Sequence, residues 1–445
     1  MPDNLISRDL RHVWHPCSQM KDYASFPPLE VVGAEGSHLI LKDGRKIIDA
    51  VSSWWCKSLG HGHPGLRDAL IRQAGKFEHV ISANTSTEVL VQLSEKLAEL
   101  CPPLDKVFYG GDGSTAVEIA LKLALHAQRV KGESHRTKFI ALENGYHGES
   151  SLALAVSDLG LYREPYDSVL PEPSILLSLP YVSSSNDPLW SDCGEVWPVL
   201  EAQLQPWAGT AAALILEPVL QGAGGMKVYS PDLLRRLREW TRKHGVYLIA
   251  DEILTGFWRT GEKLAVRHAG IAPDMLCLSK GLTGGWLPFS AVLIDPTIYD
   301  LFLSDYGQGR DFLHSNTYSG NALGAAVALE ALRLYSEPEF PKTVSALSRK
   351  MATCWEQTVL ATGAFENSRT LGTVVAADLK LPAELRGKRV GFQVYQEAMK
   401  QGALLRNLGN TVYWLPPLNS APAVIEQLAE ITAKSVLSVR QKLGF

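Results

Sequence analysis

A lysine and two acidic residues each follow a short, strongly apolar segment of this sequence. Lys280 comes directly after MLCLS (275–279), and Asp251 and Glu252 end the segment VYLIADE (246–252). Lysine is rarely buried, so a lysine at the end of an apolar strand either reaches water or is desolvated. Desolvation lowers the pKa of a lysine and makes its amine a nucleophile. Because ligands of open α/β sheets bind at the carboxyl ends of the strands, we expect Lys280 and Asp251 to share one crevice.

A glycine-rich turn adds a third element. The apolar run KVFYG (106–110) leads through GDGS into the helical pattern TAVEIALKLALHAQ. Glycine lets backbone N–H groups approach an anion, and a helix N-terminus adds partial positive charge, so Gly113 and Ser114 are candidate phosphate ligands. Taken alone, the turn is more simply explained as a tight strand-to-helix connection, and Asp251 as a solvated turn acid. Neither GxGxxG nor a Walker lysine is present, so the pattern does not indicate a dinucleotide.

The three elements together indicate one cofactor. A phosphate-binding turn, a carboxylate for a pyridinium nitrogen and an amine that forms a Schiff base are what pyridoxal 5′-phosphate requires of a protein. Each element alone is common, but the set in this order is specific. The sequence therefore predicts a pyridoxal phosphate enzyme.

Predicted strands alternate with predicted helices through the middle of the chain. Ser230, Pro231 and Gly245 delimit one helix, since serine caps helix N-termini, proline favours the first helical position and glycine ends helices. Such alternation implies crossover connections and a mostly parallel sheet in an α/β fold. The apolar runs that we interpret as strands are 106–110, 138–142, 212–219, 246–252, 275–279 and 290–295.

Both ends of the chain differ from this middle. Residues 29–51 alternate around GS and DG turns, as in a small antiparallel sheet. After residue 336, helical stretches alternate with GTVVAADL and ALLRNLGNTVYWLPP. We therefore expect a large domain at 66–335 with a mostly parallel central sheet. A smaller α+β domain should be built from both chain ends, 1–65 and 336–445.

Composition excludes several classes of protein. The 445 residues exceed what one compact core usually holds, and the net charge of −4 does not favour nucleic acid or an anionic membrane. The six cysteines are scattered, without zinc-type spacing, as in a reducing cytosol. The N-terminus has no apolar signal core, and no apolar run approaches the ~20 residues of a membrane helix. We expect a soluble cytoplasmic enzyme without a metal site.

Three segments carry a resemblance to a known family. LILEPV (214–219), LIADEILTGFWRTG (248–261) and DMLCLSKGLTGG (274–285) resemble the class III aminotransferases, which are pyridoxal phosphate-dependent transferases of fold type I. The resemblance runs from HVWHP near the N-terminus to VYWLPP near the C-terminus. Within the class, HVWHP, SSWWCKSLGHGHP and NGYHGES are similar to the biotin-pathway branch, and Trp54-Trp55 is more specific than the lysine motif.

The resemblance implies roles around the cofactor. Lys280 would bind it covalently and act as general base, Asp251 would pair with the pyridine nitrogen, and Tyr146 would stack on the ring. Gly113 and Ser114 would hold the phosphate. Without the resemblance, Tyr146 is equally a core tyrosine.

The resemblance also implies a homodimer with shared active sites. Asn316 and Thr317, in HSNTYSGN, match the segment that reaches the phosphate from the neighbouring subunit. As bare sequence, this stretch is a polar loop before a helix. Glu217 and Gln221 would lie beside the cofactor, and His147 is either supportive or structural.

The substrate implied by the branch is 7-keto-8-aminopelargonate, aminated to 7,8-diaminopelargonate by a ping-pong mechanism with S-adenosylmethionine as amino donor. Trp54 would line the apolar chain of the substrate and Arg406 would hold the carboxylate. Arg259 is a second candidate arginine, near the reacting end, and Ser315 would lie at a substrate-side backbone position. Without the resemblance, Arg406 is equally a surface strand residue. The alternatives are lysine as donor, another class III ω-amino acid aminotransferase, and a decarboxylase or aminomutase of the same fold. A pyridoxal-binding regulator would need a DNA-binding domain, which the sequence does not suggest.

Two residues depart from the branch pattern. Cys17, in HPCSQM, stands where relatives that use S-adenosylmethionine usually carry tyrosine, and it remains a candidate substrate-binding residue. Trp258 stands where glycine is usual. We expect a roomier and less polar pocket at Cys17, partly refilled by Trp258 from the opposite side.

Overall fold

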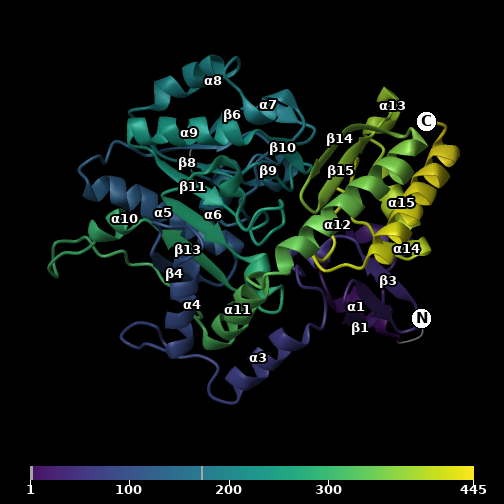
Figure 1. The fold of residues 1–445 in the computed structure, drawn as a ribbon, viewed down its shortest axis with the longest axis horizontal. Helices are drawn as coiled ribbons and strands as arrows, with labels where there is room; N and C mark the ends of the chain where they lie inside the picture. The colour runs from purple at the N-terminus through teal and green to yellow at the C-terminus, as the bar shows by residue number, and fades with distance from the viewer. Residues whose placement is uncertain (1–3, 172–173) are drawn as a thin grey trace.

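The computed structural model describes residues 4–171 and 174–445. Figure 1 shows a large lobe around a central sheet and, beside it, a smaller lobe that combines the purple start of the chain with its yellow end. Both termini lie on the smaller lobe (Figure 1). The expected α/β fold with a second α+β lobe from both chain ends is confirmed.

A seven-stranded sheet forms the centre of the large lobe, in the order β4-β13-β12-β11-β8-β5-β6. Strands β12, β11, β8, β5 and β6 pair in parallel, whereas β13 runs antiparallel to both of its neighbours. The expectation of a mostly parallel sheet is therefore confirmed. The strands are β4 (Lys106–Gly110), β5 (Lys138–Leu142), β6 (Ile175–Leu177), β8 (Ala211–Leu216), β11 (Tyr247–Asp251), β12 (Met275–Leu278) and β13 (Ser290–Ile294).

Helices cover both faces of this sheet, which explains its nearly continuous apolar strands. Ile249 of β11 faces helix α5 (Gly113–Val130), while its neighbour Leu248 packs on the face covered by α9 (Pro231–His244). Ser230 caps α9 by accepting a hydrogen bond from the N–H of Asp232, and Gly245 ends it at φ +67°. The carboxyl ends of β11 and β12 are consequently adjacent. This brings Asp251 and Lys280 to the same edge of the sheet.

The smaller lobe joins distant parts of the chain through strand pairing. β16 (Ala403–Leu404) adds in parallel to β3 (Lys46–Asp49) of the N-terminal antiparallel sheet. A second antiparallel sheet has the order β14-β15-β17. The remaining strands are β1 (Val31–Glu35), β2 (His38–Leu41), β7 (Tyr181–Val182), β9 (Leu220–Gln221), β10 (Lys227–Tyr229), β14 (Phe365–Leu371), β15 (Val374–Leu379) and β17 (Thr411–Trp414).

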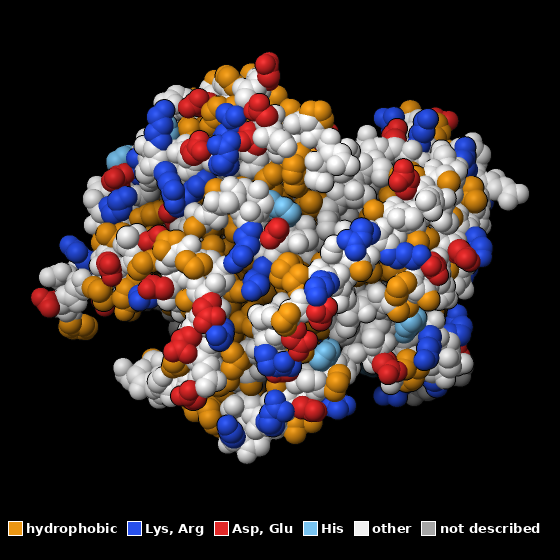
Figure 2. Space-filling model, viewed as in Figure 1, with side chains coloured by type: hydrophobic (Ala, Val, Ile, Leu, Met, Phe, Trp, Pro, Cys, Tyr) orange, Lys and Arg blue, Asp and Glu red, His pale blue; other side chains and the backbone are white. Residues whose placement is uncertain are grey.

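The other helices fill the layers around the two lobes. They are α1 (Leu5–His12), α2 (Ser52–Trp55), α3 (Pro64–Ala74), α4 (Glu88–Ala98), α6 (Ser151–Ala155), α7 (Pro188–Ser191), α8 (Trp197–Leu204), α10 (Pro296–Asp300), α11 (Ala322–Tyr335), α12 (Phe340–Cys354), α13 (Ala383–Arg386), α14 (Val390–Gln401) and α15 (Pro422–Leu443). Among the helices of residues 4–171 and 174–445, none is long and apolar enough to cross a membrane. Figure 2 shows basic and acidic side chains interspersed over this face of both lobes.

Candidate active site

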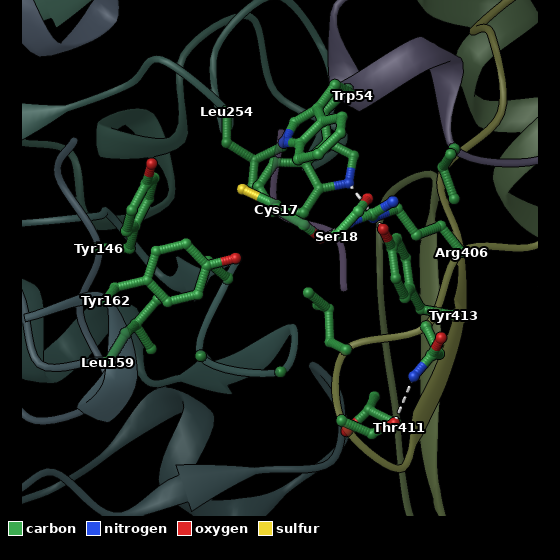
Figure 3. A pocket seen from close by; sticks show the side chains of 18 of the residues that line it. Cys17, Ser18, Trp54, Tyr146, Leu159, Tyr162, Leu254, Arg406, Thr411 and Tyr413 are labelled. Carbon is green, nitrogen blue, oxygen red and sulfur yellow. Dashed lines mark hydrogen bonds between the residues drawn. The ribbon is translucent and has the colours of Figure 1, made fainter. Parts of the chain in front are cut away.

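A cavity of about 1120 Å³ lies between the carboxyl ends of β11 and β12, the N-terminal segment and the smaller lobe. Figure 3 shows part of its wall, with side chains from both lobes turned toward the space between them. Many of the residues predicted from the sequence line it, namely Cys17, Trp54, Gly113, Ser114, Tyr146, Asp251, Lys280, Arg406, His147 and Glu217.

Lys280 follows β12 directly, in a left-handed backbone conformation with φ +46°. Such a conformation is strained for a residue with a side chain and is frequent at functional sites. Burial lowers the pKa of the Lys280 amine, opposed by the negative charges of Asp251 and Glu217. Its Nζ atom lies 4.6 Å from the centre of the Trp55 ring. A buried lysine with a lowered pKa can act as a nucleophile and as a base.

Asp251 ends β11 and is held by a histidine. Its Oδ2 lies 2.7 Å from Nδ1 of buried His147, and its Oδ1 accepts a hydrogen bond from the N–H of Ile253. The carboxylate is therefore fixed in one orientation inside the cavity.

Glu217 is a second buried acid, placed after β8. Its two oxygens accept hydrogen bonds from the N–H groups of Tyr146 (3.1 Å) and Gly222 (2.9 Å). Burial raises the pKa of Glu217 to about 7. His147 and the two N–H groups act in the opposite direction and lower this pKa. Gln221 donates from Nε2 to the Glu143 carbonyl, and its buried Oε1 has no partner in the described chain.

The start of helix α5 forms the turn predicted for an anion. Asp112 caps the helix by accepting a hydrogen bond from the N–H of Thr115. The N–H groups of Gly113 and Ser114 lie in the first helical turn, where no intrahelical acceptor exists. Gly148, at φ +126°, packs so closely that a Cβ atom there would lie 2.3 Å from Ser114 Oγ. Position 148 therefore requires glycine, because the loop that carries Tyr146 crosses the N-terminal end of α5 there.

Another part of the cavity wall combines an indole and an arginine. The guanidinium of Arg406 lies 4.5 Å from the centre of the Trp54 ring, and its Nη2 donates to the Cys17 carbonyl at 2.8 Å. Figure 3 shows Trp54, Cys17 and Arg406 together on this side, with Tyr146 across the cavity. An apolar wall ending in a cation suits a molecule with an apolar chain and a carboxylate.

Several predicted residues lie elsewhere. Arg259 is buried between the lobes, where Nη1 donates to Thr373 Oγ1 and to the Pro416 carbonyl, and it does not line the cavity. Trp258 also lies outside the cavity wall, because its Nε1 donates to the Tyr335 carbonyl. The expected refilling of the pocket by Trp258 is therefore wrong.

Ser315, Asn316 and Thr317 are exposed and do not line the cavity of their own chain. They belong to the segment between α10 and α11.

The donor set fits pyridoxal 5′-phosphate. The amine of Lys280 makes no hydrogen bond with any residue that the structure describes, and the N–H groups of Gly113 and Ser114 are equally available. These groups and the fixed carboxylate of Asp251 all face one cavity. An amine, an oriented carboxylate and a helix N-terminus match the aldehyde, ring nitrogen and phosphate of the cofactor.

Two contributions could not be found from sequence patterns. The sequence indicates His147 only through its neighbour Tyr146. Its pairing with Asp251 joins residues 104 positions apart, so no local pattern predicts it. Tyr162 lines the cavity from a short 3₁₀ turn (Gly160–Tyr162) whose sequence carries no motif.

The match to known proteins agrees with this site. Residues 19–436 match the family model described as aminotransferase class-III. The chain therefore belongs to the class III aminotransferase family, and it is a transaminase with the fold of pyridoxal phosphate-dependent enzymes of fold type I.

Similar proteins carry one particular name. The adenosylmethionine-8-amino-7-oxononanoate aminotransferase of Helicobacter pylori is 36% identical over 424 residues, which cover 93% of each chain. The enzyme of the same name from Synechococcus elongatus is 37% identical over 423 residues, covering 94% of this chain and 96% of the relative.

Solved structures show the same architecture. The crystal structure of adenosylmethionine-8-amino-7-oxononanoate aminotransferase from Methanocaldococcus jannaschii superposes with a TM-score of 0.89 at 28% identity, covering 98% of each chain. The omega transaminase of Pseudomonas jessenii in complex with PMP gives a TM-score of 0.89 at 25% identity over 99% of each chain.

Proposed function

We propose that this transaminase transfers an amino group to 7-keto-8-aminopelargonate, forming 7,8-diaminopelargonate in biotin synthesis, with S-adenosylmethionine as donor. The main support is that one cavity is lined by Lys280 and Asp251 and also by Arg406 beside Trp54. The names of the relatives at 36–37% identity support the same acceptor and donor.

The cofactor of this proposal is pyridoxal 5′-phosphate, held at its phosphate by the N–H groups of Gly113 and Ser114 and at its ring by Asp251 and Tyr146. When bound, it supplies an electron sink for the carbon that loses a proton. His147 holds the Asp251 carboxylate in one orientation, in which it would pair with the ring nitrogen of the cofactor. Lys280, whose amine burial holds at a lowered pKa, accepts the substrate proton at Nζ and returns it.

Substrate orientation follows from Arg406 and Trp54 in the cavity wall. Arg406 binds the carboxylate of the keto acid, and the Trp54 ring lines its apolar chain. The donor and the acceptor occupy the same cavity in turn, as ping-pong transamination requires.

Half-reactions test this proposal. Purified enzyme with its cofactor is mixed with one amine at a time, and loss of the visible absorption of the cofactor is followed by stopped flow. We expect S-adenosylmethionine to cause the loss and 7-keto-8-aminopelargonate to reverse it. Rapid reaction with lysine but not S-adenosylmethionine would contradict the donor, and no reversal by the keto acid would contradict the acceptor.

A second candidate is an ω-amino acid or amine transaminase, because enzymes with that name superpose as well as the named relative does. The same assay discriminates between the two. An enzyme of that class should react with short ω-amino acids and need no long-chain keto acid.

We also propose a homodimer in which Asn316 and Thr317 complete the phosphate site of the partner subunit. Their exposure, away from the cavity of their own chain, supports this arrangement. The segment projects from the large lobe (Figure 1) and exposes Leu303, Tyr306 and Leu313, which a partner would bury.

The domain boundaries and the compartment are likewise proposals. Pairing of β3 with β16 supports one small domain formed by residues 1–65 and 336–445 against a large domain at 66–335. Six free cysteines support a reducing, cytoplasmic location.

A further inference from the structure

Tyr162 is a cavity residue to which no role has yet been given. It ends the short turn Gly160–Tyr162, in the segment that follows α6. Figure 3 shows its ring entering from the side of Tyr146 and its hydroxyl turned toward the middle of the cavity, facing the side of Arg406. The rings of Tyr146 and Tyr162 meet edge to face, 6.2 Å apart.

The Tyr162 hydroxyl has unused hydrogen-bonding capacity. The Cys17 thiol is its hydrogen-bonding neighbour, and a thiol is a weak partner. Within the described chain, no oxygen or nitrogen atom accepts a hydrogen bond from this hydroxyl. Burial, followed by the effect of Cys17, raises the pKa of Tyr162 to about 12. The phenol therefore stays protonated near neutral pH and can donate to a ligand.

Arg406 presents an unpaired positive charge across the same space. Arg389, another arginine of the cavity wall, is paired with Asp22 at 2.8 Å, whereas Arg406 contacts a carbonyl and an indole. None of the described aspartate or glutamate residues forms an ion pair with Arg406. A charge without a counter-ion beside an apolar wall favours an anionic ligand.

We propose that Tyr162 is a specificity-determining residue that donates a hydrogen bond to the substrate carboxylate bound by Arg406. This inference rests on the proposed function, since the carboxylate is that of the keto acid. The ligand class is a long-chain carboxylate, and a neutral carboxamide of the same length offers Tyr162 and Arg406 only an uncharged acceptor.

Cys17 connects the two donors. Its carbonyl accepts the hydrogen bond from Arg406, and its thiol neighbours the phenol of Tyr162. The thiol of Cys17 is only a weak hydrogen-bond donor, whereas the phenol of Tyr162 is an ordinary one. The polar group that the cavity needs at this point therefore comes from the loop after α6.

The test compares Tyr162→Phe with the wild-type holoenzyme. The steady-state kinetics of 7-keto-8-aminopelargonate are measured beside those of its terminal carboxamide, which keeps the length and removes the charge. The control is Tyr166→Phe, in the same segment and similarly exposed but outside the cavity wall. Tyr162→Phe removes only a hydroxyl that faces the cavity, so the fold is not at risk.

We expect Tyr162→Phe to raise the KM of the keto acid about tenfold, as for loss of a hydrogen bond to a charged group. The kcat value should stay near that of the wild type, the KM of the carboxamide should rise less than that of the keto acid because a neutral acceptor makes a weaker hydrogen bond, and Tyr166→Phe should match the wild type. An unchanged KM, or equal losses for acid and carboxamide, would overturn the role of Tyr162 while wild-type turnover still supports the proposed function. No wild-type turnover of the keto acid would overturn both.

Discussion

At the scale of single residues, the site depends on groups whose charge is set by burial. Lys280 and Glu217 are both enclosed, and burial disfavours the charged form of each. A neutral amine is what the proposed proton transfer needs, so the environment of the lysine matters as much as its presence.

Lys280→Ala should fold normally and lose turnover. General acid–base catalysis by a placed side chain contributes roughly 10²–10⁴-fold, so kcat should fall at least that far. The control is Lys263→Ala, because burial also lowers the pKa of Lys263 although it lies outside the cavity wall. The measurement is steady-state turnover together with the thermal unfolding midpoint. Wild-type turnover in Lys280→Ala would show that another group is the base.

Glu217 should couple stability to pH. Its pKa is raised to about 7 in the folded protein, so the folded state keeps a proton that the unfolded state loses near the ordinary glutamate value. The stability that this proton contributes is complete below that ordinary value and is lost as pH rises through about 7. Relative to Glu217→Gln, the wild type should therefore lose about 1–3 kcal/mol between pH 5 and pH 8.

Urea unfolding of the apoenzyme at both pH values measures this difference. The control is Glu384→Gln on the exposed start of α13. Parallel pH profiles for wild type and Glu217→Gln would contradict the raised pKa.

At the scale of elements, the turn that presents the tandem tryptophans is the most strained part of the site. Ser52, Ser53, Trp54 and Trp55 all have positive φ, between 44° and 71°. A left-handed turn costs roughly 1–2 kcal/mol per residue for L-amino acids, so tertiary contacts must stabilise it. Asp49, which is fully buried, supplies them. It accepts hydrogen bonds from Ser53 N (2.9 Å) and Ser53 Oγ (2.7 Å) and lies 2.8 Å from His61 Nε2.

Asp49→Ala should release this turn. Loss of one partner of a buried, hydrogen-bonded network costs about 3–5 kcal/mol, and Trp54 should leave the position in which it contacts Arg406. We expect a lower free energy of unfolding and a raised KM for the keto acid. Asp43→Ala, on the exposed turn between β2 and β3, is the matched control and should change both quantities little. A normal KM in Asp49→Ala would show that the turn keeps its conformation without Asp49.

Elements that carry local sequence signals could be predicted, whereas those stabilised by contacts between distant parts of the chain could not. The strands ending at Asp251 and Lys280 and the caps of α9 follow from apolar runs and capping residues, and all are present. The turn at Trp54-Trp55 could not be predicted, because neither serine nor tryptophan favours positive φ and the stabilising His61 lies outside the turn. The position of Trp258 outside the cavity wall could not be predicted for a similar reason, because its hydrogen bond to the Tyr335 carbonyl depends on α11.

At the scale of the whole molecule, the cavity of one chain has Gly113 and Ser114 in its wall but lacks Asn316 and Thr317, which the resemblance assigns to the phosphate site of the neighbouring subunit. Ser315, Asn316 and Thr317 lie in an exposed segment, beside side chains such as Tyr306 and Leu313 that are at least 90% exposed. Apolar side chains so exposed on a projecting segment favour burial against a partner. A symmetric dimer would place this segment of each subunit at the cavity of the other.

Mixing two inactive variants distinguishes shared sites from independent ones. In a heterodimer of Lys280→Ala and Thr317→Ala, one site carries both defects, whereas the other combines an intact Lys280 with an intact Thr317 from the partner chain. Random exchange makes half of the dimers mixed, so recovery of about a quarter of wild-type activity is expected.

The control pairs Lys280→Ala with Arg406→Ala. Lys280 and Arg406 line the same cavity of one chain, so each site of that heterodimer keeps one defect and activity should stay low. Equal recovery in both mixtures, or none in the first after subunit exchange has been verified, would contradict a shared site. Recovery in the first mixture alone would place Thr317 at the partner's cofactor site, since only that arrangement gathers both intact residues in one cavity.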